Sequence, residues 1–285
     1  MVGLLGCGGL FSSTAKTLPD PYLTLYEADD LRYDGKYREA LAKYEQVLKG
    51  FPRSSFDSAR VNTKFLPMFK YGVAFCYTKL AEVEADVSLY SKAEAAVRES
   101  YETATVESER AAALHLWGYI LFRQARYVQA CTKLERVIEE YPQYRFDGYA
   151  LQPAVYVLGE AYLELGDEAA ARQAFGAFKK QLEIDLQQDS PYIDYNLVYL
   201  LGEAYLELGD KTDAGWAFRQ VEERVASDLQ DGYAFLPFDN DLYGLAKAYL
   251  RLSDEAAARR TFTLLLKYYP DSPHKPELEH LLGNQ

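Results

Sequence analysis

The side chains of this chain that could carry catalysis are limited in type. Its 285 residues include three histidines and three cysteines beside 43 acidic residues, so a general base would have to be a carboxylate. Glu160 and Glu164 lie one helical turn apart, which suits an acid and base pair or a solvated helix face. The sequence contains no glycine-rich phosphate loop, GxSxG or HExxH motif. We therefore expect a protein that is not an enzyme and has no catalytic residue.

The histidines and two of the cysteines also predict no metal site and no cofactor. His274 and His280 lie near the C-terminus without a cysteine or carboxylate at metal-ligand spacing, and we interpret them as surface residues. Cys76 and Cys131 form neither a CxxC pair nor a disulfide framework. Their positions favour buried, small hydrophobic residues, with a disulfide between them as the alternative.

Cys7 is the cysteine whose surroundings suggest modification. Residues Leu4-Leu5-Gly6-Cys7 resemble a bacterial lipobox, in which the cysteine becomes the lipidated first residue of the mature chain. Only six uncharged residues precede Cys7, whereas a signal segment needs a positive start and about 7 to 15 apolar residues. Glycine, serine, threonine and proline then predominate up to Pro21, which is typical of a flexible tether. We expect residues 1–20 to form a leader with a possible lipobox and tether, or else a disordered leader.

Composition and charge narrow the classes of partner. The 31 basic and 43 acidic residues give a net charge of −12, so binding to a phosphate backbone by counterion release is excluded and we expect no nucleic-acid partner. No stretch approaches the roughly 18 uninterrupted apolar residues of a membrane helix. Attachment to a membrane would therefore have to come from acyl chains at Cys7.

A ten-residue run, LGEAYLELGD, occurs at residues 158–167 and again, letter for letter, at residues 201–210. Apolar side chains at Leu158, Tyr162 and Leu165 share one helical face, and Gly166-Asp167 predicts a helix stop and turn. The run belongs to a longer repeat, because a small residue recurs every 41 to 46 residues. These small residues are Ala28, Gly72, Gly118, Gly159, Gly202 and Ala246.

Alanine follows twelve residues after most of these positions, a bulky side chain follows four residues later, and proline closes several units. This pattern resembles the tetratricopeptide repeat over residues 21–273, in six units. The resemblance implies an all-α solenoid of six helical hairpins, capped by residues 274–285, in which close helix crossings need small residues. Units of about 44 instead of 34 residues leave about ten extra, which should lengthen helices or links.

The resemblance also implies a concave groove, lined by the first helix of each unit at repeat positions 2, 5, 9, 12 and 13. We predict that aromatic and acidic side chains there bind protein or peptide segments with basic and apolar side chains. The alternative is that the tyrosines pack between units. The predicted partner-binding residues are Phe69, His115, Tyr119, Tyr156, Glu160, Glu164, Tyr199, Glu203, Glu207 and Tyr243.

Three functions remain open for such a chain. The first is a protein-binding scaffold, lipid-anchored to the outer membrane in the bacterial periplasm, similar in layout to the tetratricopeptide lipoproteins of barrel or pilus assembly. The second is a cytoplasmic adaptor in which Cys7 is incidental. The third is a structural subunit of a large complex.

Overall fold

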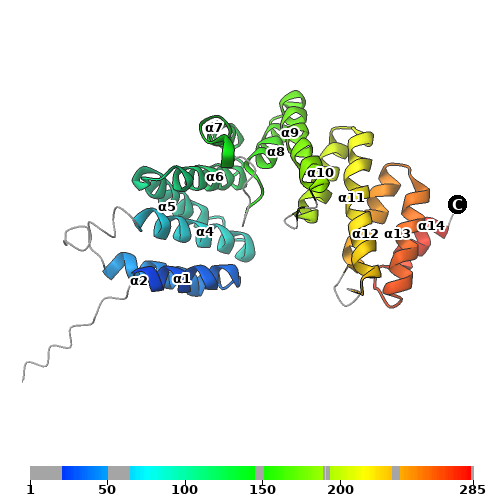
Figure 1. The fold of residues 1–285 in the computed structure, drawn as a ribbon, viewed down its shortest axis with the longest axis horizontal. Coiled ribbons are helices and arrows are strands. Elements are labelled where there is room, and N and C mark those ends of the chain that lie inside the picture. Colours follow the sequence, from blue (N-terminus) through cyan, green and yellow to red (C-terminus); the bar gives the residue numbers. More distant parts are fainter. Residues whose placement is uncertain are drawn as a thin grey trace, which may run out of the picture. The chain divides into compact units, whose positions relative to one another are not determined.

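The computed structural model describes residues 21–50, 65–144, 151–188, 190, 193–232 and 238–283 (Figure 1). These residues form helices joined by turns and contain no strand, so the predicted all-α class is confirmed. The chain divides into two compact units, residues 1–120 and 121–285. We describe each unit separately.

The first unit begins with two packed helix pairs. Helix α1 packs on α2, α2 on α4, and α4 on α5. The division between the two units falls within α6, after Ile120. The helices are α1 (Pro21–Tyr33), α2 (Tyr37–Gly50), α4 (Leu66–Glu84), α5 (Leu89–Thr103) and α6 (Glu107–Arg123).

The second unit contains three helical hairpins, α8 with α9, α10 with α11 and α12 with α13, while α7 packs on α8 and α14 on α13. The helices are α7 (Tyr127–Glu140), the short η1 (Pro142–Tyr144), α8 (Ala154–Glu164), α9 (Glu168–Gln187), α10 (Tyr195–Glu207), α11 (Lys211–Gln230), α12 (Asp239–Arg251), α13 (Glu255–Tyr268) and α14 (Lys275–Gly283). Within the two units, five pairs of successive helices pack on one another, α1 with α2, α4 with α5, α8 with α9, α10 with α11 and α12 with α13, and α14 follows the last pair. The predicted all-α solenoid with a C-terminal helix is thus confirmed.

The turns inside the hairpins follow from two residue types. Gly166 and Gly209 have φ of 75° and 74°, a left-handed conformation that glycine adopts at little cost. Asp167 and Asp210 then cap the next helix, because each side chain accepts a hydrogen bond from a backbone N–H three residues on, at 3.1 Å. The Gly-Asp turn predicted from the repeated run is thus confirmed.

The small residues of the repeat face aromatic rings. A Cβ added to Gly159 would lie 2.5 Å from the ring of Phe175, and one added to Gly202 would lie 2.5 Å from that of Phe218. Both contacts join the two helices of one hairpin, as predicted. Gly72 differs, because a Cβ there would lie 2.5 Å from Tyr44, on the preceding pair.

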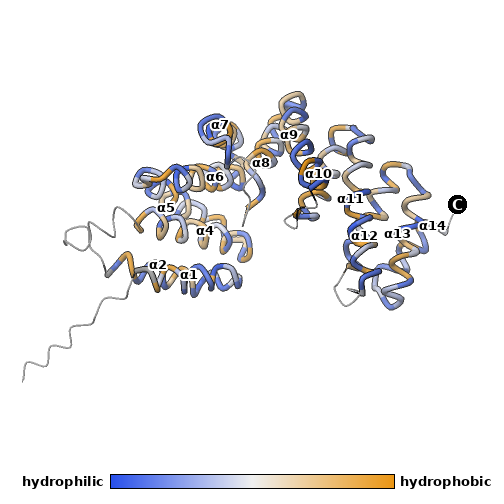
Figure 2. The backbone as a smooth tube through the Cα atoms, viewed as in Figure 1, coloured by the Kyte–Doolittle hydropathy of each residue, from blue (hydrophilic) through white to orange (hydrophobic). Residues whose placement is uncertain are grey.

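Some of the extra residues lengthen helices. The second helices α9 and α11 have 20 residues each, and α4 has 19. Apolar and polar residues alternate along α11 and α13, while α8 is largely apolar (Figure 2). None of the helices that the structure describes is both long and apolar enough to cross a lipid bilayer.

Tyrosine hydroxyls join successive helix pairs by donating to carboxylates. We call these contacts tyrosine joints. Tyr77 on α4 donates to Glu45 on α2 at 3.0 Å, and Tyr119 on α6 donates to Glu82 on α4 at 2.7 Å. In the second unit, Tyr162 donates to Glu135 on α7, and Tyr249 on α12 donates to Glu222 on α11 at 2.7 Å. Four of the 25 tyrosines of this chain therefore join one helix pair to the next.

Candidate functional site

Two of the predicted aromatic residues lie in the core. Phe69 is fully buried, and its ring meets that of Tyr44 edge-on with centroids 6.1 Å apart. Tyr156 is only 1% exposed, and its ring centroid lies 5.6 Å from Phe175 and 5.7 Å from Phe178. For these two residues the structure favours packing, the alternative to partner binding.

The two predicted residues of α6 are also buried. Tyr119 is 5% exposed and forms the tyrosine joint with Glu82, and His115 is 7% exposed. In this conformation neither side chain presents a surface to a partner.

Tyr243 on α12 is engaged by the C-terminal helix. Its ring stacks on His274, with centroids 4.1 Å apart and planes inclined by 13°. Its hydroxyl donates to Glu277 at 2.7 Å and accepts from Lys247 at 3.0 Å. Helix α14 thus occupies one side of this predicted contact position.

Tyr199 is the predicted aromatic residue that lies beside open space. Its ring centroid is 5.4 Å from that of Phe218, which fixes one side of the phenol. Its hydroxyl lies close to α12, where a Cβ added to Gly244 would be 3.2 Å away. Tyr199 therefore reaches from α10 to α12 and lines a pocket between them.

The predicted carboxylates of α8 and α10 are close enough to affect one another. Burial raises the pKa of Glu160 to about 7, with the negative charges of Glu207 and Glu164 adding to the shift, although a hydrogen bond from Tyr156 opposes it. Glu164 and Glu207 are exposed. Glu203 differs from these three because it pairs with Arg251 of α12. We call Glu160, Glu164 and Glu207 the acidic wall.

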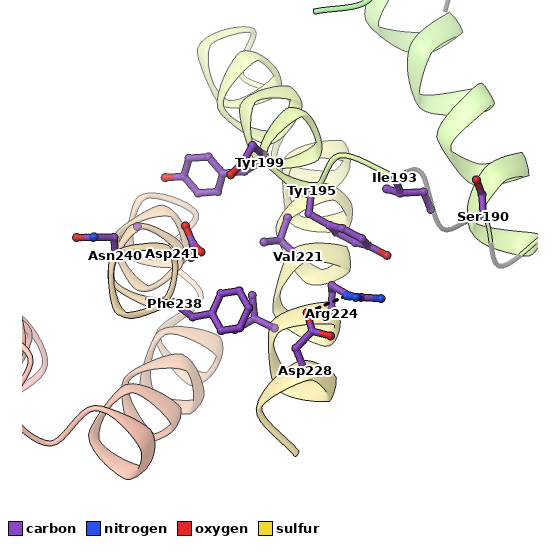
Figure 3. A pocket seen from close by; sticks show the side chains of 13 residues that line it. Ser190, Ile193, Tyr195, Tyr199, Val221, Arg224, Asp228, Phe238, Asn240 and Asp241 are labelled. Carbon is purple, nitrogen blue, oxygen red and sulfur yellow. Dashed lines mark hydrogen bonds and ion pairs between the residues drawn. The ribbon is translucent and has the colours of Figure 1, made fainter. Parts of the chain in front are cut away.

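The pocket beside Tyr199 has a volume of about 450 Å³ and lies at α10, α11 and the start of α12 (Figure 3). Aromatic side chains line it from α10 and from the residue before α12, and polar side chains come from all three helices. The residues of interest here are Tyr195, Asn196, Tyr199, Arg224, Asp228, Phe238, Asn240 and Asp241.

The pocket is lined by one paired cation and by one carboxylate that has no cationic partner among the described residues. Arg224 pairs with Asp228 one turn further along α11, at 2.9 Å, and its guanidinium lies 5.7 Å from the centroid of the Tyr195 ring. Asp241 has no cationic partner among the described residues. Burial, with the neighbouring charge of Asp239, raises the pKa of Asp241 above its ordinary value. Asp228 thus neutralises the charge of Arg224, and Asp241 leaves the pocket with one net negative charge.

Several pocket residues were not predicted from the sequence. Asn196 and Asn240 occupy repeat position 2, so reading that contact position along the repeats would have found them. Asn240 also lies 2.8 Å from Nε2 of His274. Arg224 and Asp228 come from a second helix, where the family pattern gives no contact position, and nothing in the sequence marked them.

The two described cysteines agree with their interpretation as buried, small residues. Cys76 and Cys131 are buried and free, and burial raises the pKa of their thiols to about 12 and about 11. Within the described ranges, no three histidine, cysteine or acidic side chains are grouped to hold a metal ion. Cys7 lies outside the described residues.

Comparison with known proteins identifies the repeats. A tetratricopeptide repeat family model matches residues 112–144, 154–181 and 242–272, and a second such model matches residues 25–62. No curated protein matches the sequence.

Three solved structures illustrate the similarity in fold. PilW, a widely conserved type IV pilus biogenesis factor, is 17% identical with a TM-score of 0.59, covering 90% of this chain and 97% of PilW. Pseudomonas aeruginosa pilF is 16% identical, with a TM-score of 0.54 and coverages of 92% and 97%. The Rap conjugation gene regulator of plasmid pLS20, in complex with the Phr* peptide, is 15% identical, with a TM-score of 0.51 and coverages of 97% and 78%. At such identities the similarity shows the fold alone.

Proposed function

Because tetratricopeptide repeat models match four segments of the chain, we propose that it is a scaffold that holds a polypeptide segment along the first helices of its second unit. The pocket at α10, α11 and α12 carries this proposal. Its volume of about 450 Å³ lies in the range of ligand-binding cavities, and Tyr199 and Asn196 line it from predicted contact positions. The pLS20 regulator, which shares the fold, was solved with a bound peptide.

The charge of the chain favours a partner with basic and apolar side chains. The acidic wall presents carboxylates from α8 and α10, and the whole chain carries a net charge of −12. Opposite charges across an interface accelerate association and select the partner. Nucleic acid, with its phosphate backbone, is disfavoured on the same ground.

We also propose where the protein acts: in the bacterial envelope, held to the membrane by a lipid anchor at Cys7. Support comes from the lipobox-like residues that end at Cys7 and from PilW, a type IV pilus biogenesis factor with a similar fold over 97% of its length. A cytoplasmic adaptor would share the groove but would lack the lipid, so acylation at Cys7 distinguishes the two.

Site-specific crosslinking in the cells that make the protein tests the scaffold face. A photoreactive residue placed at Asn196, which is exposed on α10, should trap a partner polypeptide. The same residue at Glu223, exposed on α11 and outside the pocket, is the matched control. Equal trapping at the two positions, or none at Asn196, would contradict the proposed face. Mass spectrometry of the trapped species then identifies the partner.

A further inference from the structure

The pocket at α10, α11 and α12 combines aromatic surface with uneven charge. Tyr195 and Tyr199 of α10 and Phe238, the residue before α12, bring three rings to it (Figure 3). The faces of such rings attract cations, and their edges and sides pack against the methylenes of long side chains. Aromatic surface of this kind therefore suits a side chain that has both an apolar stem and a positive head.

The carboxylate of Asp241 also favours a side chain that ends in a positive charge. Arg224 is neutralised by Asp228 at 2.9 Å, whereas Asp241 lines the pocket without a cation among the residues that the structure describes. An entering anion would meet Asp241, while Arg224, the cation among the lining residues, is already paired with Asp228. A wholly apolar side chain would remove water from Asp241 without replacing it, which is costly for a carboxylate.

We infer that this pocket binds the arginine or lysine side chain of the partner segment, with its head at Asp241 and its stem against Tyr199 and Phe238. The inference rests on the proposed scaffold function and adds a specificity to it. One cationic residue seated at a fixed place would set the position of the segment along α10 and α12.

Titration of the full-length chain by NMR, with a blocked peptide Gly-Ser-Leu-Arg-Leu-Ser-Gly as the probe, tests the inference. The matched probe replaces arginine with citrulline, which has nearly the same shape without the charge. We expect the arginine peptide to bind about tenfold more tightly and to shift the ring signals of Tyr199 and Phe238. Equal affinities, or no binding of either peptide, would overturn the inference.

Three variants separate the pocket from general charge effects. Asp241→Asn should remove most of the preference for arginine over citrulline, while Glu223→Gln removes one carboxylate outside the pocket and should preserve it. Arg224→Gln leaves Asp228 unpaired, so we expect it to strengthen binding of the arginine peptide severalfold, a gain that unfolding cannot produce. If Asp241→Asn and Glu223→Gln act alike, or Arg224→Gln weakens binding, the pocket does not take a cation.

The outcomes for the two proposals remain distinguishable. Trapping of a partner at Asn196 together with equal binding of the two peptides would leave the scaffold in place and exclude the cation pocket. Absence of trapping at Asn196 would reject the scaffold face whatever the peptides show.

Discussion

Glu160 has a carboxyl group that holds its proton more tightly in the folded chain than in water. Its pKa rises from 4.5 to about 7, first because of burial and then because of Glu207 and Glu164. The folded state is therefore favoured by protonation, and this stabilisation is full below about pH 4.5 and lost as the pH rises through about 7. Above that pH the wild-type chain keeps a partly buried negative charge.

We expect Glu160→Gln to stabilise the chain at pH 8 by about 1–3 kcal/mol relative to wild type, and by much less at pH 5. Denaturant unfolding at the two pH values measures the difference. Glu223→Gln, which removes an exposed carboxylate, should change stability by no more than about 0.5 kcal/mol at either pH. A gain for Glu160→Gln that is the same at both pH values would argue against the raised pKa.

The sequence predicted the types of residue at the contact positions better than their roles. Tyr156 and Tyr199 occupy the same repeat position, yet only Tyr199 lies beside the pocket. The difference comes from neighbours, since Tyr156 is enclosed by Phe175 and Phe178. Position in a repeat gives the face of a helix, but the exposure of a side chain depends on residues far away in the sequence.

At the scale of the helical hairpin, Gly159 permits the close approach of α8 and α9. Alanine ordinarily stabilises a helix relative to glycine, but its Cβ here would lie 2.5 Å from the Phe175 ring. Gly159→Ala should therefore destabilise the chain by about 1–3 kcal/mol. Gly176→Ala is the matched control, because a Cβ at this position of α9 meets nothing within 4 Å and should stabilise by about 0.5–1 kcal/mol. Thermal and denaturant unfolding should give opposite signs for the two variants.

The tyrosine joints give a second prediction at this scale. Tyr249 donates to the buried Glu222 at 2.7 Å, whereas the hydroxyl of the equivalent Tyr205 has no hydrogen-bond partner among the described residues. Tyr249→Phe should destabilise the chain by about 1–3 kcal/mol, because Glu222 loses a donor. Tyr205→Phe should be neutral or slightly stabilising. Equal effects in denaturant unfolding would show that the joint adds nothing beyond packing.

The helices were largely predictable, since the repeat indicated their pairing and the two Gly-Asp turns indicated where α9 and α11 begin. The side chains that pack against the small residues of the repeat were less predictable. Gly72 faces Tyr44 of the preceding pair, and the second helix of its own pair, α5, carries Val97 at the position where four of the other five units carry a ring. The repeat also gave no sign that residues near the end of α11 would line the pocket, because second helices lack contact positions in the family pattern.

For the molecule as a whole, the testable property is attachment to a membrane. A net charge of −12 repels anionic lipid, so a membrane-bound fraction would depend on acylation at Cys7. In a full-length precursor, Cys7→Ser should move the protein from the membrane to the soluble fraction, as measured by fractionation and immunoblotting. Cys76→Ser, at a buried cysteine, serves as the control. An unchanged membrane fraction for Cys7→Ser would count against a lipid anchor at Cys7.

The ten-residue run that occurs at residues 158–167 and again at 201–210 makes it simple to shorten the chain by one deletion. Tyr162 and Tyr205 stand at the same place in the two copies, but the position that holds Glu135 for Tyr162 holds Gly176 for Tyr205. Excision of residues 158–200 would join Val157 directly to Leu201 and restore the same ten letters without a foreign junction. Tyr205 would then take the place of Tyr162 in the pair after α7, and its hydroxyl would donate to Glu135. A single in-frame deletion between the copies would thus yield a solenoid one hairpin shorter whose new joint is already complementary.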